Sequence, residues 1–94
     1  TGPVHWELSF RARALDTQVY LLGCAPARDL TASYHSWGHS IVTDPWGTVT
    51  AQLAEAEGIL FAELDLEKVE TIRKELPLLR HRRTDVYELR EVRK

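Results

Sequence analysis

A short apolar run near the start of the chain constrains the fold more than any other feature. Val19-Tyr20-Leu21-Leu22 ends at Gly23, a pattern typical of a strand that is buried on both faces. Such a strand needs a neighbouring strand on each side and a covering layer on each face. The other predicted elements of the 94 residues leave one sheet face and one edge uncovered. The sequence therefore predicts part of an α/β domain, about half of one.

Two helices and three further strands are predicted around this run. Val4, Leu8, Ala12 and Leu15 share one helical face, and Asp65 is a favourable N-cap for a second helix that Pro77 ends. The turn Asp44-Pro45-Trp46-Gly47 has type I preferences and joins two strands. The predicted segments are a helix at Pro3–Asp16, a loop at Ala25–Gly38, strands at His39–Thr43, Val49–Leu53 and Ile59–Leu64, a helix at Leu66–Leu76, and a tail at Leu78–Lys94.

Composition excludes several classes of protein. Twelve basic and fourteen acidic residues give a net charge of −2, which argues against a general nucleic-acid or membrane binder. No apolar run approaches the roughly 18 residues of a membrane helix. The chain lacks methionine, so we expect it to be processed or to be a piece of a longer protein. Its single cysteine fits a reducing compartment, and we expect a cytoplasmic location.

The residue types alone leave the chemistry open. Cys24 precedes His35 and His39, and a Cys–His pair can form an activated nucleophile. The alternative is that Cys24 is a buried packing residue, which is the commoner role of a free cysteine. Only His35 and His39 have the spacing of a metal-ligand pair, and they lie in a loop and at a strand start, where this spacing does not put them on one face. We therefore expect no metal site and no cofactor. The basic run from Arg80 to Arg83 is either a solvated surface or an anion-binding patch.

Five stretches in a fixed order resemble a known family. They are TGPVHWEL, RARALDTQVY, APARD, ASYHSWGHSIVTDPWGTV and LPLLRHRRTDVY. Together they resemble the C-terminal part of a carbon–nitrogen hydrolase of the nitrilase superfamily, in its omega-amidase branch. Thr17 departs from the asparagine that relatives often have there, which affects local hydrogen bonding.

The resemblance implies a fold and an activity. Residues 1–94 would be the C-terminal segment of one four-layer αββα sandwich domain, with a mixed β-sheet and two helices over residues 1–77 and a tail over 78–94. The family cleaves amides with a Glu, a Lys and a Cys, and the omega-amidase branch acts on 2-oxoglutaramate and 2-oxosuccinamate. All three catalytic residues would precede Thr1, so this segment alone is predicted to be inactive.

The resemblance also implies a substrate-binding role for part of the chain. Thr1, His5 and Trp6 would form one pocket wall, and Arg28 and Tyr34 would lie near the pocket rim. Thr1 could instead cap the first helix, and Arg28 could instead pair with Asp29 or contact a second subunit. The expected partners are a small-molecule amide and a second copy of the full-length protein. The alternatives are deaminated-glutathione amidase specificity or a non-catalytic module that pairs with full-length subunits.

Overall fold

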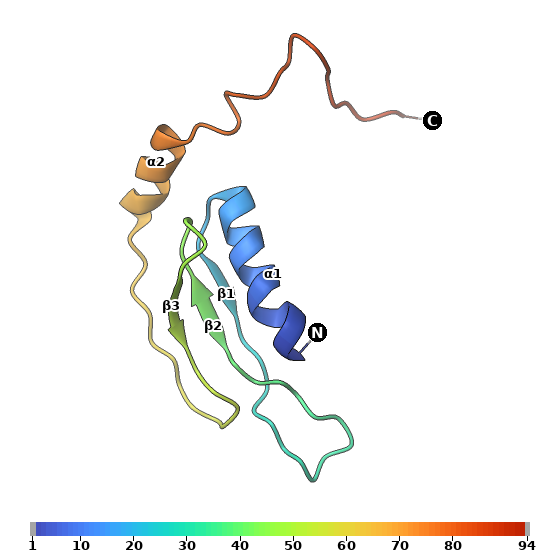
Figure 1. Cartoon of the computed structure of the whole chain (residues 1–94), viewed down its shortest axis with the longest axis vertical. Helices are drawn as coiled ribbons and strands as arrows, with labels where there is room; N and C mark the ends of the chain where they lie inside the picture. Colours follow the sequence, from blue (N-terminus) through green and yellow to red (C-terminus); the bar gives the residue numbers. More distant parts are fainter. Residues whose placement is uncertain (1, 94) are drawn as a thin grey trace.

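Residues 2–93 are described by a computed structural model and form two helices and one sheet (Figure 1). The order is α1 (Gly2–Thr17), β1 (Leu21–Gly23), β2 (Ile41–Thr43), β3 (Val49–Gln52) and α2 (Leu66–Glu75). α1 contacts β1 and β2, and α2 lies close to the turn between β2 and β3 (Figure 1). The α/β class, both helices and the hairpin were predicted from the sequence, and the structure confirms them. Thr1 lies outside the described residues.

The sheet is antiparallel throughout, in the order β1-β2-β3. Leu22 lies opposite Val42 and Val42 lies opposite Ala51, with a bulge after Val42. The prediction of a mixed sheet is therefore wrong for the described residues. The tight turn between β2 and β3 permits only antiparallel pairing of those two strands. The connection from β1 to β2 is long enough for either direction, and it returns antiparallel.

The predicted strand Ile59–Leu64 is also wrong. This segment follows the sheet along its side, but no strand within residues 2–93 pairs with it (Figure 1). Ile59 is 78% exposed and Phe61 is 85% exposed. A strand needs a partner for its backbone N–H and C=O groups, and alternating apolar residues alone do not supply one.

The apolar stripe that predicted α1 is not the face that packs on the sheet. Val4 and Leu8 are 69% and 62% exposed, whereas Ala14 is fully buried. The packed face instead carries Trp6, Phe10 and Ala14, four residues apart, and the Phe10 ring lies against Gly23 of β1. α1 therefore has two apolar faces, and the sheet covers only one of them.

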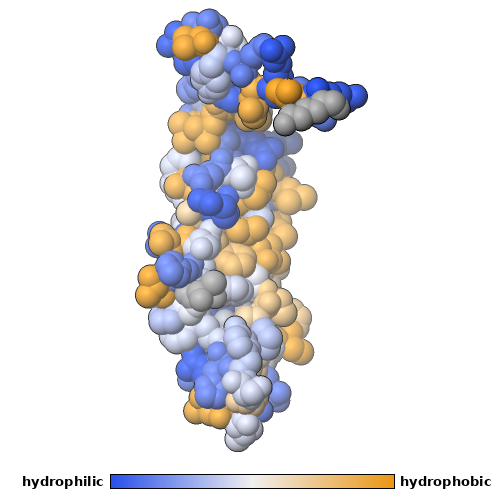
Figure 2. Space-filling model, turned by 90° about the vertical axis from the view of Figure 1, so that its right-hand side faces the viewer, coloured by the Kyte–Doolittle hydropathy of each residue, from blue (hydrophilic) through white to orange (hydrophobic). Residues whose placement is uncertain are grey.

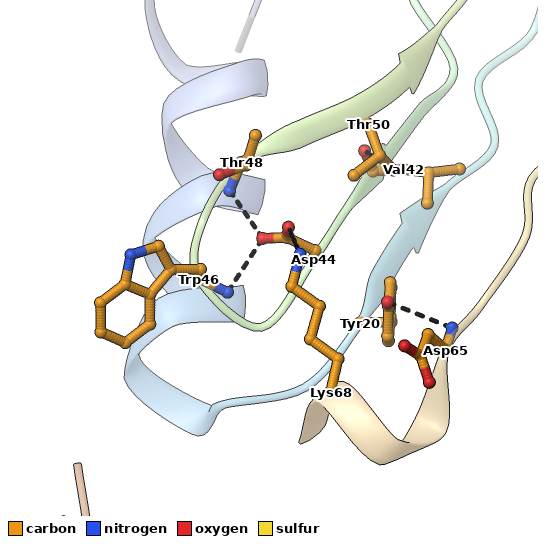
Figure 3. Close-up of polar contacts among 8 residues, drawn as sticks. All are labelled: Tyr20, Val42, Asp44, Trp46, Thr48, Thr50, Asp65 and Lys68. Atoms are coloured by element: carbon orange, nitrogen blue, oxygen red, sulfur yellow. Dashed lines mark hydrogen bonds and ion pairs between the residues drawn. The ribbon is translucent and has the colours of Figure 1, made fainter. Parts of the chain in front are cut away.

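The turn between β2 and β3 is organised by a buried carboxylate (Figure 3). Asp44 Oδ1 accepts hydrogen bonds from the amides of Trp46 (2.9 Å) and Thr48 (3.0 Å), and the Gly47 amide donates to the Asp44 carbonyl. Gly47 has a φ of 78°, which favours glycine. These bonds confirm the predicted turn at Asp44–Gly47.

The chain divides into a body, residues 2–53, and an arm, residues 54–93. Lys68 of α2 pairs with Asp44 of the body at 2.6 Å, and the Tyr20 hydroxyl accepts a hydrogen bond from the Asp65 amide (Figure 3). Asp65 caps α2 as predicted, because its side chain accepts from the Glu67 amide. Residues 77–93 form no helix or strand and lead away from the body (Figure 1).

Much apolar surface of the described residues is exposed. Figure 2 shows hydrophobic side chains gathered along one flank of the molecule. The exposed apolar residues include Leu22 on β1, Ile59 and Phe61 on the arm, and Leu15 on α1. No helix within residues 2–93 is both long and apolar enough to cross a lipid bilayer.

Candidate functional site

A cleft of about 510 Å³ lies between the first turn of α1 and the loop that connects β1 to β2. Eight residues line it: Gly2, Pro3, Arg28, Leu30, Tyr34, His35, Ser36 and Trp37. The cleft brings together two of the predicted site residues, Arg28 and Tyr34. Gly2 and Pro3 also line it, whereas the predicted site residue Thr1 lies outside the described residues.

The loop that forms one wall of the cleft is fixed by hydrogen bonds to its own ends and to the arm. The Arg28 amide donates to the Glu55 carbonyl at 2.8 Å, and the Ser36 hydroxyl donates to the Pro26 carbonyl at 2.9 Å. Gly38 has a φ of 73°, and a Cβ atom there would lie 2.9 Å from Glu55 Cα. Glycine is therefore required at the point where the loop passes the arm.

Arg28 is held in one orientation. Its Nε donates to the Ser36 carbonyl at 3.1 Å and its Nη2 donates to the Trp37 carbonyl at 2.9 Å. The guanidinium carbon lies 4.7 Å from the centre of the Trp37 ring. No ion pair with Asp29 is found among the described residues, because Asp29 bonds the amide and hydroxyl of Thr31 instead.

Within residues 2–93 the Arg28 side chain bonds backbone carbonyl groups and has no carboxylate partner. Hydrogen bonds from the Thr31 hydroxyl and amide lower the pKa of Asp29 below its ordinary value. Asp29 is therefore ionised at neutral pH, and its side chain accepts hydrogen bonds from Thr31 rather than from the Arg28 guanidinium. Arg28 keeps hydrogen-bonding capacity for a ligand, because a guanidinium has five N–H donors and two are occupied here.

The other predicted site residues differ in position. Tyr34 is 77% exposed at the rim of the cleft. His5 is exposed on α1 and does not line the cleft. Trp6 is half-buried, and its indole Nε1 donates to the His39 carbonyl at 2.7 Å. Trp6 therefore connects α1 to the residues just before β2, and it does not line the cleft.

Cys24 is exposed, so the prediction that it is a buried packing residue is wrong. Side chains alternate along a strand, which places Cys24 on the same face as Leu22, opposite α1. No second layer covers that face within residues 2–93. The Cys–His arrangement is not formed either, since no hydrogen bond within the described range joins Cys24 to His39. His39 Nδ1 lies 2.7 Å from the Trp37 carbonyl instead.

The histidines also remain apart. His35 Nε2 lies 3.1 Å from the Leu30 carbonyl, and the His39 ring stacks on Trp37. Over residues 2–93, no three His, Cys, Asp or Glu side chains gather in an arrangement that could hold a metal ion. The basic run is on the arm, where Arg83 pairs with Asp85 at 2.7 Å.

Sequence reasoning missed how the loop orients Arg28. The carbonyl groups of Ser36 and Trp37 are its hydrogen-bond acceptors, and backbone acceptors leave no trace in residue type. A partial signal was present, because Trp37 and His39 are aromatic neighbours in a loop that also contains an arginine.

Known proteins resemble this chain over most of its length. The family model for carbon–nitrogen hydrolases matches residues 1–74. The omega-amidase NIT3 of Saccharomyces cerevisiae is 54% identical over 87 residues, which are 93% of this chain and 30% of the relative. The omega-amidase NIT2 of Mus musculus is 52% identical over 93% of this chain and 32% of its own length. The chain thus spans about a third of the length of these relatives.

Solved structures agree with the sequence matches. The crystal structure of Saccharomyces cerevisiae Nit3, described as a member of branch 10 of the nitrilase superfamily, superposes with a TM-score of 0.82 at 52% identity, covering 87% of this chain and 30% of that one. The Caenorhabditis elegans NitFhit protein gives a TM-score of 0.82 at 44% identity over 90% of this chain and 21% of that one. The sheet, the helices and the loop described above are therefore a segment of the nitrilase fold, and the chain belongs to the carbon–nitrogen hydrolase family.

Proposed function

We propose that this chain is the C-terminal segment of an omega-amidase, which releases ammonia from the terminal amides of 2-oxoglutaramate and 2-oxosuccinamate. One observation carries the proposal: the relatives named omega-amidases are 46–54% identical to it over nearly its whole length. In this proposal residues 1–94 belong to a single domain, with the sheet and helices within 1–77 and a tail from 78. The complete enzyme is proposed to be a cytoplasmic homodimer or larger homo-oligomer.

The segment contributes a substrate-binding wall. The proposed substrates carry a carboxylate beside the 2-oxo group, and Arg28 can bind a carboxylate through its remaining N–H donors. Tyr34, at the rim of the same cleft, can donate its hydroxyl proton. Thr1 is proposed to extend this wall, since the next two residues line the cleft. His5 and Trp6 are proposed to support it from α1.

The chemistry is proposed to come from residues outside this segment. A Cys thiolate attacks the amide carbonyl, the C–N bond breaks, and the nitrogen leaves as ammonia after receiving a proton from the Glu. Water then attacks the thioester, which releases the acid and restores the thiol, while the Lys stabilises the oxyanion. Support for this placement comes from Cys24, which is exposed and, within residues 2–93, forms no hydrogen bond with a histidine, a carboxylate or a residue of the cleft.

A substrate comparison with the complete enzyme tests the proposal. Ammonia release is measured for 2-oxosuccinamate, 2-oxoglutaramate and deaminated glutathione at equal concentrations. We expect both small 2-oxo acids to have kcat/KM values at least about tenfold above that of deaminated glutathione, a difference of about 1.4 kcal/mol in transition-state binding. The opposite order would assign the enzyme to the deaminated-glutathione amidases.

A second candidate function is an interaction module that pairs with full-length subunits. The observation in its favour is the apolar surface on both sides of the body, with Leu8 on α1 and Leu22 on β1 more than half exposed. Native mass spectrometry of the chain mixed with a full-length relative would detect a hybrid. The absence of any hybrid at micromolar concentration would exclude this role.

A further inference from the structure

Three planar groups are stacked behind the cleft. The Arg28 guanidinium lies over the Trp37 ring at 4.7 Å, and the Trp37 ring lies over the His39 ring at 4.3 Å with an angle of 10° between the planes. Arg28 and Trp37 line the cleft, whereas His39 does not. The Trp37 ring is therefore the contact that the guanidinium and the imidazole share, and only the imidazole is absent from the cleft lining.

The imidazole end of the stack is fixed to the rest of the fold. The His39 amide donates to the Ala54 carbonyl at 3.0 Å, and the His39 carbonyl accepts from Trp6 at 2.7 Å. His39 also has a φ of 60°, a left-handed conformation that costs a non-glycine residue energy and persists where its surroundings hold it. His39 is thus anchored to α1 through Trp6 and to the arm through Ala54.

The Trp37 carbonyl couples the two ends of the stack. It accepts a hydrogen bond from Arg28 Nη2 at 2.9 Å and lies 2.7 Å from His39 Nδ1. A carbonyl oxygen can only accept, so Nδ1 must carry the proton and donate it. His39 therefore fixes Trp37 by stacking on its ring and by a hydrogen bond to its carbonyl group. Trp37 in turn fixes Arg28, because its ring contacts the guanidinium and its carbonyl group accepts from Nη2.

The consequence is a guanidinium with one free edge. Ser36 and Trp37 occupy Nε and Nη2, and no hydrogen bond within residues 2–93 occupies Nη1. A guanidinium that is already oriented loses little conformational entropy when it binds a carboxylate. We propose that Trp37 and His39 are positioning residues that fix Arg28 for the carboxylate of the substrate. This inference rests on the proposed function, because it takes Arg28 as the carboxylate ligand.

A KM comparison in the complete enzyme tests the inference. Trp37→Leu removes the stacking ring, Trp37→Phe keeps one, and His39→Asn removes the imidazole with a residue that tolerates positive φ. With 2-oxosuccinamate we expect Trp37→Leu and His39→Asn to raise KM about tenfold with kcat changed less than about threefold. Trp37→Phe should restore most of the wild-type KM.

A double variant separates positioning from general damage to the fold. In an Arg28→Gln background, Trp37→Leu should raise KM by less than about twofold, because its effect passes through Arg28. An equal rise with and without Arg28 would overturn the inference. The inference would also be overturned if Arg28→Gln raised KM and Trp37→Leu left it unchanged. An unchanged KM in Arg28→Gln would overturn it as well.

A spectroscopic readout distinguishes this inference from the proposed function. The Arg28 Nε–H, bonded to the Ser36 carbonyl, should give a side-chain NMR signal that exchanges slowly with water in the wild type and in Trp37→Phe. The signal should exchange rapidly in Trp37→Leu and His39→Asn. If the wild-type enzyme released no ammonia from either 2-oxo acid, the proposed function would fail, while this signal would still decide whether the stack fixes Arg28. Equal exchange in all variants would overturn the inference.

Discussion

The body and the arm are held by different kinds of interaction. The body has a three-stranded sheet and several fully buried residues, including Ala14, Ile41 and Thr43. Over the described part of the arm only Ile72 is buried. Polar contacts attach the arm to the body, among them Lys68 with Asp44 and Gln18 with the Leu76 carbonyl at 2.8 Å. Packing therefore dominates in the body, whereas α2 is held by the buried side chain of Ile72 together with a few hydrogen bonds and one ion pair.

The two regions meet at Asp44, so substitutions there have the largest expected effect. Asp44→Ala leaves the Trp46 and Thr48 amides without their acceptor and Lys68 without its partner. The side chain of Asp44 is only 3% exposed, so we expect a loss of about 2–4 kcal/mol in the stability of the hairpin. Amide hydrogen exchange of Trp46 and Thr48 measures the loss.

Asp44→Asn is the matched control for that prediction. Its amide oxygen can still accept from Trp46 and Thr48, but its charge is gone. The turn amides should therefore stay protected while the α2 amides exchange faster. If the turn amides lost equal protection in both variants, the carboxylate oxygen would not be what holds the turn.

Gly38→Ala has the next largest expected effect, at the crossing of the loop and the arm. A Cβ atom at Gly38 would lie 2.9 Å from Glu55 Cα, and the φ of 73° disfavours any other residue. We expect about 1–3 kcal/mol of lost stability, measured by the exchange of the Arg28 and His39 amides. Unchanged exchange of both amides would show that the crossing can relax freely.

Lys68→Met separates the arm from the body with a smaller effect. The Lys68 side chain is 41% exposed, so its ion pair with Asp44 contributes less than about 1 kcal/mol. We expect faster exchange of the α2 amides and unchanged exchange in β2 and β3. Equal losses in both regions would contradict the division between body and arm.

The pH dependence of the same ion pair is the mildest test. Burial raises the pKa of Asp44, but hydrogen bonds from Lys68, Thr48 and Trp46 outweigh it, and the net pKa lies below the ordinary value. The stabilisation that the ionised Asp44 side chain contributes is complete above the pKa of Asp44 in the unfolded chain, about 3.9. It is lost as the pH falls through the lower pKa of Asp44 in the folded chain.

At high pH the ion pair is lost because Lys68 loses its charge. The hydrogen bond to Asp44 raises the pKa of Lys68, so its contribution is complete below about 10.4 and is lost as the pH rises through the folded value. We expect constant protection of α2 between these limits and a decline outside them in exchange measurements corrected for the intrinsic pH dependence. A decline near neutral pH would contradict this assignment.

Local signals predicted one feature of the body and one of the arm. The Asp44–Gly47 turn of the body and the Asp65 cap of the arm depend on residues within a few positions of one another, and both formed as predicted. The same reasoning failed for Ile59–Leu64 because a strand depends on a distant partner. It also failed for α1, since periodicity identifies an apolar face without showing which of two such faces the sheet covers.

The site residues were expected from the family resemblance and not from local signals. Arg28 and Tyr34 both line the cleft described above, and their role in binding substrate stays a prediction. The stack of Arg28, Trp37 and His39 could not be foreseen, because it depends on the positive φ of His39 and on one shared carbonyl group. Neither feature is encoded by a residue type alone.

We propose that this chain supplies a substrate-binding wall and no catalytic residue. The most direct measurement is ammonia release from 2-oxosuccinamate by the chain alone, with Cys24→Ala as the comparison. We expect both to release ammonia no faster than buffer. Release that grows with the concentration of the chain and disappears in Cys24→Ala would contradict this proposal, because it would make Cys24 the nucleophile.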